Sequence, residues 1–330
     1  MKPRDWGLAA LRHEDLTPYR PPTFELTMEL TQELLGRRWI TLEDLQAVAG
    51  AERGRMLAER AETYLLAAER LEYSFIRVRF FPTLEDELEC IRVLRSLGGD
   101  DYLITAEADN TFRIPDGAEL QQFVYDLHDR PEDVLTYADR WCAEGIDRGK
   151  RLIDAGVQVI TMCADYFFNN GPFLSPRMWE RFIGQFYDRH VVAFKDYGAW
   201  IIKHTDGNIM PLLDRLVAPG IDALQSIDPI AGVDIAEVKR RIGDRVCLIG
   251  NVDLAKLQQG PWSEIATSAR YCLAHAAVGG GYIYGSCNSI FQGVPLENYL
   301  YMLDIWRGTG PSPLAQPAAI VPVSAGIGED

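Results

Sequence analysis

The clearest strand of the chain runs into a polar turn in the segment Ala199-Trp200-Ile201-Ile202-Lys203-His204-Thr205-Asp206-Gly207-Asn208. The apolar run predicts a buried strand, and side chains two positions apart on a strand face the same way. His204 and Asp206 are therefore expected to point at one spot just beyond the strand, which is where barrels of alternating strands and helices place their chemistry. The pair predicts a metal-binding or acid–base site. The alternative is a hydrogen-bonded strand-end histidine followed by an aspartate that caps a turn.

Six further apolar runs read as strands, at 73–80, 102–106, 157–163, 223–227, 246–249 and 282–284. Helical patterns lie between most of them, at 84–97, 134–155, 176–197, 235–242, 262–277 and 296–306. This alternation predicts an α/β fold in which helices cover a parallel sheet, and a (β/α)8 barrel of the TIM type is the first choice. Seven strands are one short of eight, so an irregular barrel or an open sheet is the alternative.

The two ends of the chain differ from this alternating region. Residues 27–70 have helical spacing of leucines and are rich in Ala, Leu, Glu and Arg, so residues 1–72 are predicted to form an N-terminal helical cap. The barrel is expected over 73–307. Residues 308–330 carry four prolines among small residues and are expected to form a loosely packed tail.

Composition excludes several classes of function. The 330-residue chain carries a net charge of −15, which argues against a nucleic-acid surface and against an anionic membrane as partner. No run approaches the roughly 20 apolar residues of a membrane span, and the first residues do not resemble a signal peptide. The six cysteines are scattered without a C-x-x-C pair, as is usual for reduced thiols. We therefore expect a cytoplasmic enzyme that acts on a small molecule, and a homo-oligomer is compatible with the sequence.

Polar residues end several of the predicted strands and should gather at one face of a barrel. The candidates for proton transfer or substrate positioning are Glu107, Asp165 and Asp206, and those for substrate binding are Arg77, Arg79, Asn208, Asn251 and Asn288. Each of these residues alone is more simply explained as a cap or turn residue. Six such strand ends together predict a polar, acidic pocket.

Within that pocket four residues form a candidate metal site: His204, Asp206, Asp228 and Cys287. Imidazole, carboxylate and thiolate all suit zinc, and three protein ligands with one open position are typical of a catalytic zinc site. The ligands would come from separate strand ends, so nothing local fixes their geometry. The alternative for Cys287 is a small residue packed under a loop.

These motifs resemble the uroporphyrinogen decarboxylase superfamily over roughly residues 154–306. The likeness includes Ser175-Pro176 after Asp165, the strand end at 204–208, Gly250-Asn251-Val252-Asp253, and Gly293-Val294-Pro295-Leu296-Glu297-Asn298. The resemblance implies a distorted (β/α)8 barrel. It also implies one of two activities: decarboxylation of uroporphyrinogen without a cofactor, or zinc-dependent methyl transfer of the methylcobalamin:coenzyme M and corrinoid-linked demethylation type.

The departures from the family pattern separate the two branches. In the methyltransferase branch, His204 matches the first zinc ligand and Cys287 falls where the last is expected, whereas Asp206 replaces a cysteine and makes the ligand set harder. The arginine motif R-Q-A-G-R of the decarboxylases is absent, and so is the corrinoid motif D-x-H-x-x-G. The resemblance therefore favours a methyltransferase, with any corrinoid supplied by a separate partner protein. A decarboxylase of the uroporphyrinogen type and a non-catalytic binding barrel are the alternatives.

Overall fold

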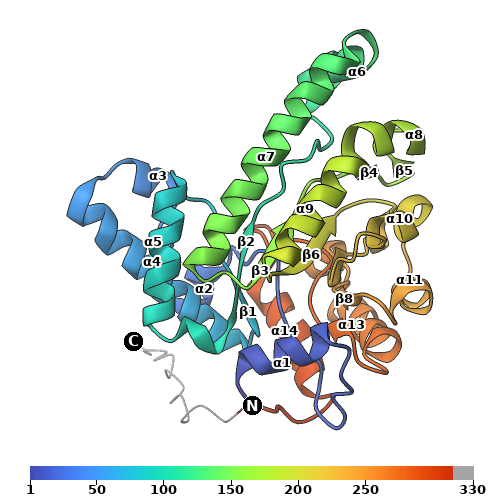
Figure 1. Cartoon of the computed structure of the whole chain (residues 1–330). Coiled ribbons are helices and arrows are strands. Elements are labelled where there is room, and N and C mark those ends of the chain that lie inside the picture. Colours follow the sequence, from blue (N-terminus) through green and yellow to red (C-terminus); the bar gives the residue numbers. More distant parts are fainter. Residues whose placement is uncertain (315–330) are drawn as a thin grey trace.

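The computed structural model describes residues 1–314, and its centre is a curled sheet of seven parallel strands surrounded by helices (Figure 1). The strands lie in the order β1-β2-β3-β6-β7-β8-β9. Their bounds are β1 (Phe75–Arg77), β2 (Leu103–Glu107), β3 (Val159–Met162), β6 (Trp200–Thr205), β7 (Ala223–Ser226), β8 (Cys247–Ile249) and β9 (Tyr282–Ile283). A small hairpin, β4 (Phe167–Phe168) with β5 (Gly171–Pro172), follows β3. The predicted α/β barrel is confirmed, and all seven predicted strands are present.

Helices cover the outside of the sheet and form the N-terminal region. The larger ones are α1 (Pro3–Leu11), α4 (Gly50–Leu71), α5 (Leu84–Ser96), α6 (Gly117–Asp129), α7 (Pro131–Ala155), α9 (Gln185–Asp196), α11 (Ile235–Ile242), α13 (Trp262–Ala276) and α14 (Leu296–Arg307). Short helices are α2 (Thr31–Leu35), α3 (Leu42–Gln46), α8 (Pro176–Trp179), α10 (Leu213–Val217) and α12 (Leu254–Gln259). None of the helices in residues 1–314 has the length and apolar character to cross a bilayer. The predicted tail lies mostly outside the described residues, because only its first part, 308–314, falls within them.

The eighth position of the barrel wall is occupied by an N-terminal segment, residues 22–28, which we call the closing segment. Thr23 forms parallel bridges both to Tyr73, just before β1, and to Tyr284, just after β9. Backbone hydrogen bonds join Phe24 N to Tyr284 O at 3.1 Å and Ser74 N to Thr23 O at 3.0 Å. The two edges of the seven-stranded sheet are thus connected through a stretch that belongs to the predicted helical cap.

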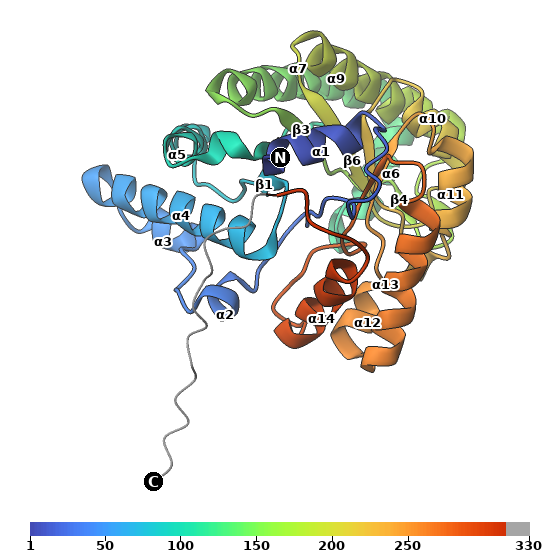
Figure 2. The same cartoon turned by 90° about the horizontal axis from the view of Figure 1, so that it is seen from below.

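The interior of the barrel is apolar at one level and polar above it. One buried cluster takes a side chain from every strand and from the closing segment; its members include Phe24, Phe75, Leu103, Val159, Ile202, Ala223, Cys247 and Ile283. Helix α1 lies across the opposite end of the barrel from the strand carboxyl ends, and Figure 2 shows it over the centre of the ring of helices. Ala10 and Leu11 of α1 join the same cluster, so the lower end of the barrel is closed by apolar packing.

A buried ion pair connects β6 to the segment after β2. Lys203 and Asp109 are both fully buried, with Nζ 3.1 Å from Oδ2. The ammonium also donates to Ala164 O at 2.8 Å and lies 4.1 Å from the ring centre of Tyr166. Burial by itself would raise the pKa of Asp109, but the charge of Lys203 and other partners hold that pKa below its usual value. Each charge needs the other, because a buried charge without its partner has lost its hydration with nothing to compensate for it.

We expect Lys203→Met to lower the free energy of unfolding by about 3 kcal/mol or more, because it leaves the Asp109 carboxylate buried without its counter-ion. The control is Lys195→Met, which removes an exposed lysine whose Nζ lies 2.6 Å from Asp222 on the outside of the barrel. That loss should be below about 1 kcal/mol. Urea unfolding of the three proteins measures both values, and equal losses would contradict a stabilising role for the buried pair.

Candidate active site

The polar residues of the site stand directly above the apolar layer because side chains on a strand alternate in direction. His204 and Gln225 come two residues after Ile202 and Ala223, so both pairs face the interior, with the polar pair nearer the carboxyl ends of β6 and β7. The register places His204 directly beside Gln225 on the neighbouring strand. The mouth of the barrel is thus lined by side chains that the strand period itself turns inward.

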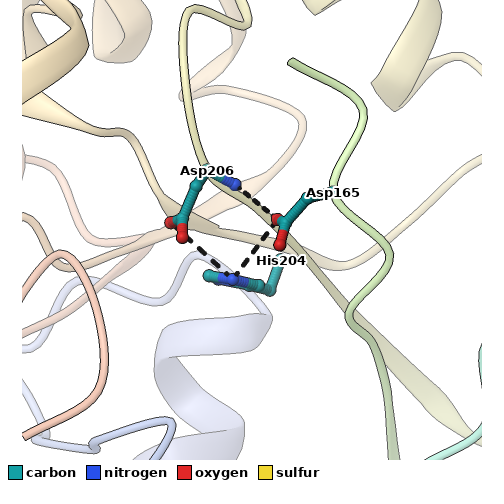
Figure 3. Close-up of side chains that lie close together, drawn as sticks. All are labelled: Asp165, His204 and Asp206. Carbon is teal, nitrogen blue, oxygen red and sulfur yellow. Dashed lines mark hydrogen bonds and ion pairs between the residues drawn. The ribbon is translucent and has the colours of Figure 1, made fainter. Parts of the chain in front are cut away.

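Three side chains converge at this mouth: Asp165, His204 and Asp206 (Figure 3). One ligand atom from each lies within 4.8 Å of the other two. Within residues 1–314, no other set of three His, Cys, Asp or Glu side chains comes as close together. Nε2 of His204 lies 3.7 Å from an oxygen of Asp165 and 3.7 Å from an oxygen of Asp206. The predicted pairing of His204 with Asp206 at one spot is therefore present, with Asp165 as the third member.

A neighbouring amide orients the imidazole. Nδ1 of His204 and Oε1 of Gln225 form a short hydrogen bond, and an amide oxygen can only accept, so Nδ1 carries the proton. Nε2 faces the two carboxylates, and in the neutral imidazole it is the nitrogen that carries the lone pair. The amide nitrogen of Gln225 lies 3.5 Å from Ser286 O and 3.4 Å from Cys287 O, which fixes the orientation of the amide.

Asp206 is held by hydrogen bonds to both of its oxygens. Oδ1 accepts from Ser226 Oγ at 2.8 Å, and Oδ2 accepts from Asn288 Nδ2 at 2.6 Å. Ser226 has a φ of 87°, a left-handed conformation that costs energy in a residue with a side chain and is often found at functional sites. Burial raises the pKa of Asp206, and the nearby Asp165 carboxylate raises it further.

This donor set fits a divalent metal ion. Imidazole nitrogen and carboxylate oxygen both bind zinc at about 2.0–2.2 Å, which sets neighbouring ligand atoms about 3.3–3.5 Å apart. The observed separations of 3.7 Å require only a small closure. The hydrogen bond of His204 to Gln225 is the kind of outer contact that orients a metal-binding histidine. The Asp165 side chain is 41% exposed, so one side of the group is open to a substrate.

The other predicted metal ligands lie outside this group. Asp228 accepts a hydrogen bond from Ile230 N at 2.9 Å and caps the short 3₁₀ helix that begins at Pro229. Cys287 is buried, and its burial raises the pKa of its thiol. Their roles as metal ligands stay predictions.

The predicted substrate-binding residues have different surroundings. Asn208 accepts from Met210 N, and Asn251 donates to Ile227 O at 2.6 Å, so both amides stabilise turns. Asn288 belongs to the site through its bond to Asp206.

Two arginines and one glutamate line the β1–β2 side of the mouth. Glu107 is half exposed and accepts from Arg77 Nη2 at 2.8 Å. Arg77 also donates to Leu26 O of the closing segment. Arg79 follows β1 and lies beside the ring of Phe80.

Gln225 and Ser226 were not among the residues predicted for the site. They are the polar end of the predicted strand 223–227, but neither is a usual metal ligand or proton-transfer residue, so no specific role was predicted for them. The signal that could have found them is the register between β6 and β7, which sets Gln225 beside His204.

Comparison with known proteins assigns the chain to a family. The model of the family "Uroporphyrinogen decarboxylase (URO-D)" matches residues 116–308, which is more than half of the chain. The uroporphyrinogen decarboxylase of Aeromonas salmonicida is 30% identical over 241 residues, which cover 66% of this chain and 63% of that protein. The enzyme of the same name from Coxiella burnetii is 27% identical over 188 residues, or 54% of this chain and 48% of that protein. The chain thus spans less than two thirds of the length of these curated relatives.

A solved structure resembles the whole barrel. A methyltransferase from Methanosarcina mazei superposes with a TM-score of 0.70 at 18% identity and covers 93% of this chain and 98% of that chain. At this identity the likeness concerns the fold. The matched family model, the relatives and the barrel agree, and the chain belongs to the uroporphyrinogen decarboxylase family.

Proposed function

We propose that the protein is a metal-dependent methyltransferase whose metal ion is held by Asp165, His204 and Asp206. The observation that carries the proposal is the free Nε2 of His204 placed beside two carboxylates, with Nδ1 occupied by Gln225. The methyltransferase from Methanosarcina mazei supports it, because its fold covers nearly all of this chain. The methyl group would come from a small methylated donor or from a corrinoid carried by a separate protein.

The residues around the proposed metal ion would have different roles in catalysis. A bound divalent ion, with zinc as the first choice, would act as a Lewis acid that lowers the pKa of a thiol acceptor or polarises the oxygen of a methyl ether. Gln225 keeps the proton on Nδ1, while Ser226 and Asn288 hold the two oxygens of Asp206. The half-exposed Glu107 is available to position a substrate or to move a proton.

A decarboxylase of the uroporphyrinogen type is the second candidate, because the curated relatives carry that name. A substrate with many carboxylates needs several cations and backbone donors to hold it. The closing segment contributes Glu25 and no arginine to this end of the barrel. Of the two arginines on the β1–β2 side of the mouth, Arg77 is already paired with Glu107, which leaves Arg79 alone to bind a carboxylate. The charge at the mouth therefore favours the methyltransferase.

We expect the purified protein to contain about one divalent ion per chain. His204→Ala and Asp165→Asn should lose most of it, because each removes one member of a three-ligand set. Cys287→Ala and Asp228→Asn serve as controls that should keep the wild-type metal content. Elemental analysis after purification without chelator gives the result. A metal-free wild type would refute the site, and loss in Cys287→Ala with retention in Asp165→Asn would restore the thiolate as a ligand.

Gln225 provides a test that separates orientation from ligation. Gln225→Leu removes the acceptor for Nδ1, so the affinity for metal should fall about 10- to 100-fold while all three ligands remain. Gln225→Glu keeps an acceptor at the same reach and should keep the affinity. Competition with a chromophoric chelator measures both variants, and equal affinities for Leu and Glu would show that the hydrogen bond has no such role.

We expect no enzymatic decarboxylation of uroporphyrinogen, because the arginine motif of the decarboxylases is missing from the sequence. The assay is anaerobic incubation followed by chromatography of the oxidised products. The enzyme from Aeromonas salmonicida, run in parallel, shows that the substrate is intact. Accumulation of coproporphyrin at a comparable rate would reverse the order of the two candidates.

A further inference from the structure

A separate cavity lies between the N-terminal helices and β1, beside the mouth of the barrel. It measures about 430 Å³, within the range of roughly 300–1,000 Å³ that is usual for small-molecule sites. Its walls are mainly apolar and include the rings of Trp39, Tyr64, Tyr73 and Phe80. Apart from Gln292, every lining residue precedes residue 116, where the match to the family model begins. The cavity is therefore a feature of this chain's N-terminal part.

One cation in the cavity wall has no counter-ion. Arg79 forms no ion pair or side-chain hydrogen bond within residues 1–314, and its guanidinium carbon lies 3.5 Å from the ring centre of Phe80. Burial lowers the pKa of Arg79 to about 10, so the side chain stays charged at neutral pH. The other two arginines of the wall are paired, Arg77 with Glu107 and Arg38 with Asp44.

The backbone around Arg79 is held in an unfavourable conformation. Phe80 has a φ of 62°, which is left-handed for a residue with a large side chain. Arg60, only 1% exposed, donates to Arg79 O at 2.6 Å and to Phe80 O at 2.8 Å and so fixes the turn. The guanidinium of Arg60 lies 4.8 Å from the ring centre of Trp39. Arg60 therefore contacts both the turn at Arg79 and Phe80 and the aromatic wall of the cavity at Trp39.

Two carboxyl groups, Glu25 and Glu29, and the threonine Thr27 also line the cavity. Burial raises the pKa of Glu25 to about 8, so its carboxyl group is mostly neutral at pH 7 and does not repel an anion. Thr27 is 6% exposed, lines the cavity, and its Oγ1 has no hydrogen-bond partner in the described residues. That oxygen is inaccessible to solvent, so the cavity offers one unpaired cation, Arg79, with the Glu29 carboxylate in the same wall, among aromatic and aliphatic side chains.

We propose that this cavity binds a small monocarboxylate with a flat aromatic body, with its carboxylate on Arg79 and its ring between the aromatic side chains. A single unpaired cation selects one carboxylate, and the enclosed apolar walls select an uncharged body. The inference stands on the cavity alone and does not depend on methyl transfer or on a metal ion, so either can fail without the other.

Hydrogen bonds connect the cavity to the proposed metal site. Glu25 Oε1 accepts from Ser286 N at 2.9 Å, and Glu25 Oε2 lies 2.5 Å from Ser286 Oγ. Ser286 Oγ is also bonded to Asn288 O, and Asn288 holds Asp206. A ligand in the cavity would therefore lie beside a wall whose other end positions one carboxylate of the triad.

Isothermal titration with 2-naphthoate tests the proposal. The wild type should bind it at one saturable site, and Arg79→Gln should weaken binding about tenfold or more through loss of a charge-assisted contact. Arg79→Lys keeps the charge and should recover part of the loss. The matched control is Arg55→Gln, which removes an exposed arginine on α4 outside the cavity and should leave binding unchanged.

A comparison of ligands requires no variant and so holds even if a substitution impairs folding. The neutral 2-naphthalenemethanol has the same rings without the carboxylate. Its affinity for the wild type should be lower than that of 2-naphthoate by about tenfold or more. Thermal melting of each variant checks that it is folded. Absence of saturable 2-naphthoate binding by the wild type would overturn the proposal. The proposal would also be overturned if the wild type bound 2-naphthoate and 2-naphthalenemethanol with equal affinity. The same holds if a folded Arg79→Gln bound 2-naphthoate as tightly as the wild type does.

Discussion

One layer of apolar side chains inside the barrel determines where along the barrel axis the polar residues of the candidate site lie. Each of the seven strands adds at least one inward residue to that level, and on β6 and β7 the next inward residue, two positions on, is polar and stands at the mouth. Ile202 thereby places His204, and Ala223 places Gln225. Because the strands are parallel, all of these polar residues meet at one end, while α1 closes the other. The position of the triad follows from the strand period and from the packing beneath it.

Strand positions were readable from the sequence, because each of the seven strands is a compact apolar run between turn residues. The closing segment was not predicted as part of the barrel wall. Thr23-Phe24-Glu25-Leu26 does alternate polar and apolar residues, but this stretch is short and follows two prolines. Its pairing depends on the two sheet edges that it meets, which no local pattern records. The convergence of Asp165, His204 and Asp206 followed from their strand ends. The acceptor role of Gln225 did not, because it depends on the register between two strands. The turn contacts of Asn208 and Asp228 agree with the simpler explanation of single polar residues at strand ends.

The triad and the aromatic cavity come from two different parts of the sequence. The triad and its hydrogen-bond partners lie within residues 116–308, which the family model matches. The aromatic cavity, Arg79 and the closing segment precede that region. Glu25 and Ser286 join the two across the barrel mouth. If both proposals hold, the barrel would supply the metal ligands and the N-terminal part would bind the second ligand.

The closing segment also has a consequence for how the chain folds. Thr23 must pair with Tyr284, and 261 positions separate the two residues. During synthesis the segment leaves the ribosome before any strand of the sheet, yet its partner after β9 follows only when nearly the whole barrel has been made. Contacts of such long sequence separation carry a large loop-closure entropy and slow folding. Until β9 arrives, the incomplete sheet exposes two unpaired edges, which are surfaces prone to aggregation. Completion of the barrel is therefore expected to be a late event, and the nascent chain to be most vulnerable immediately before it.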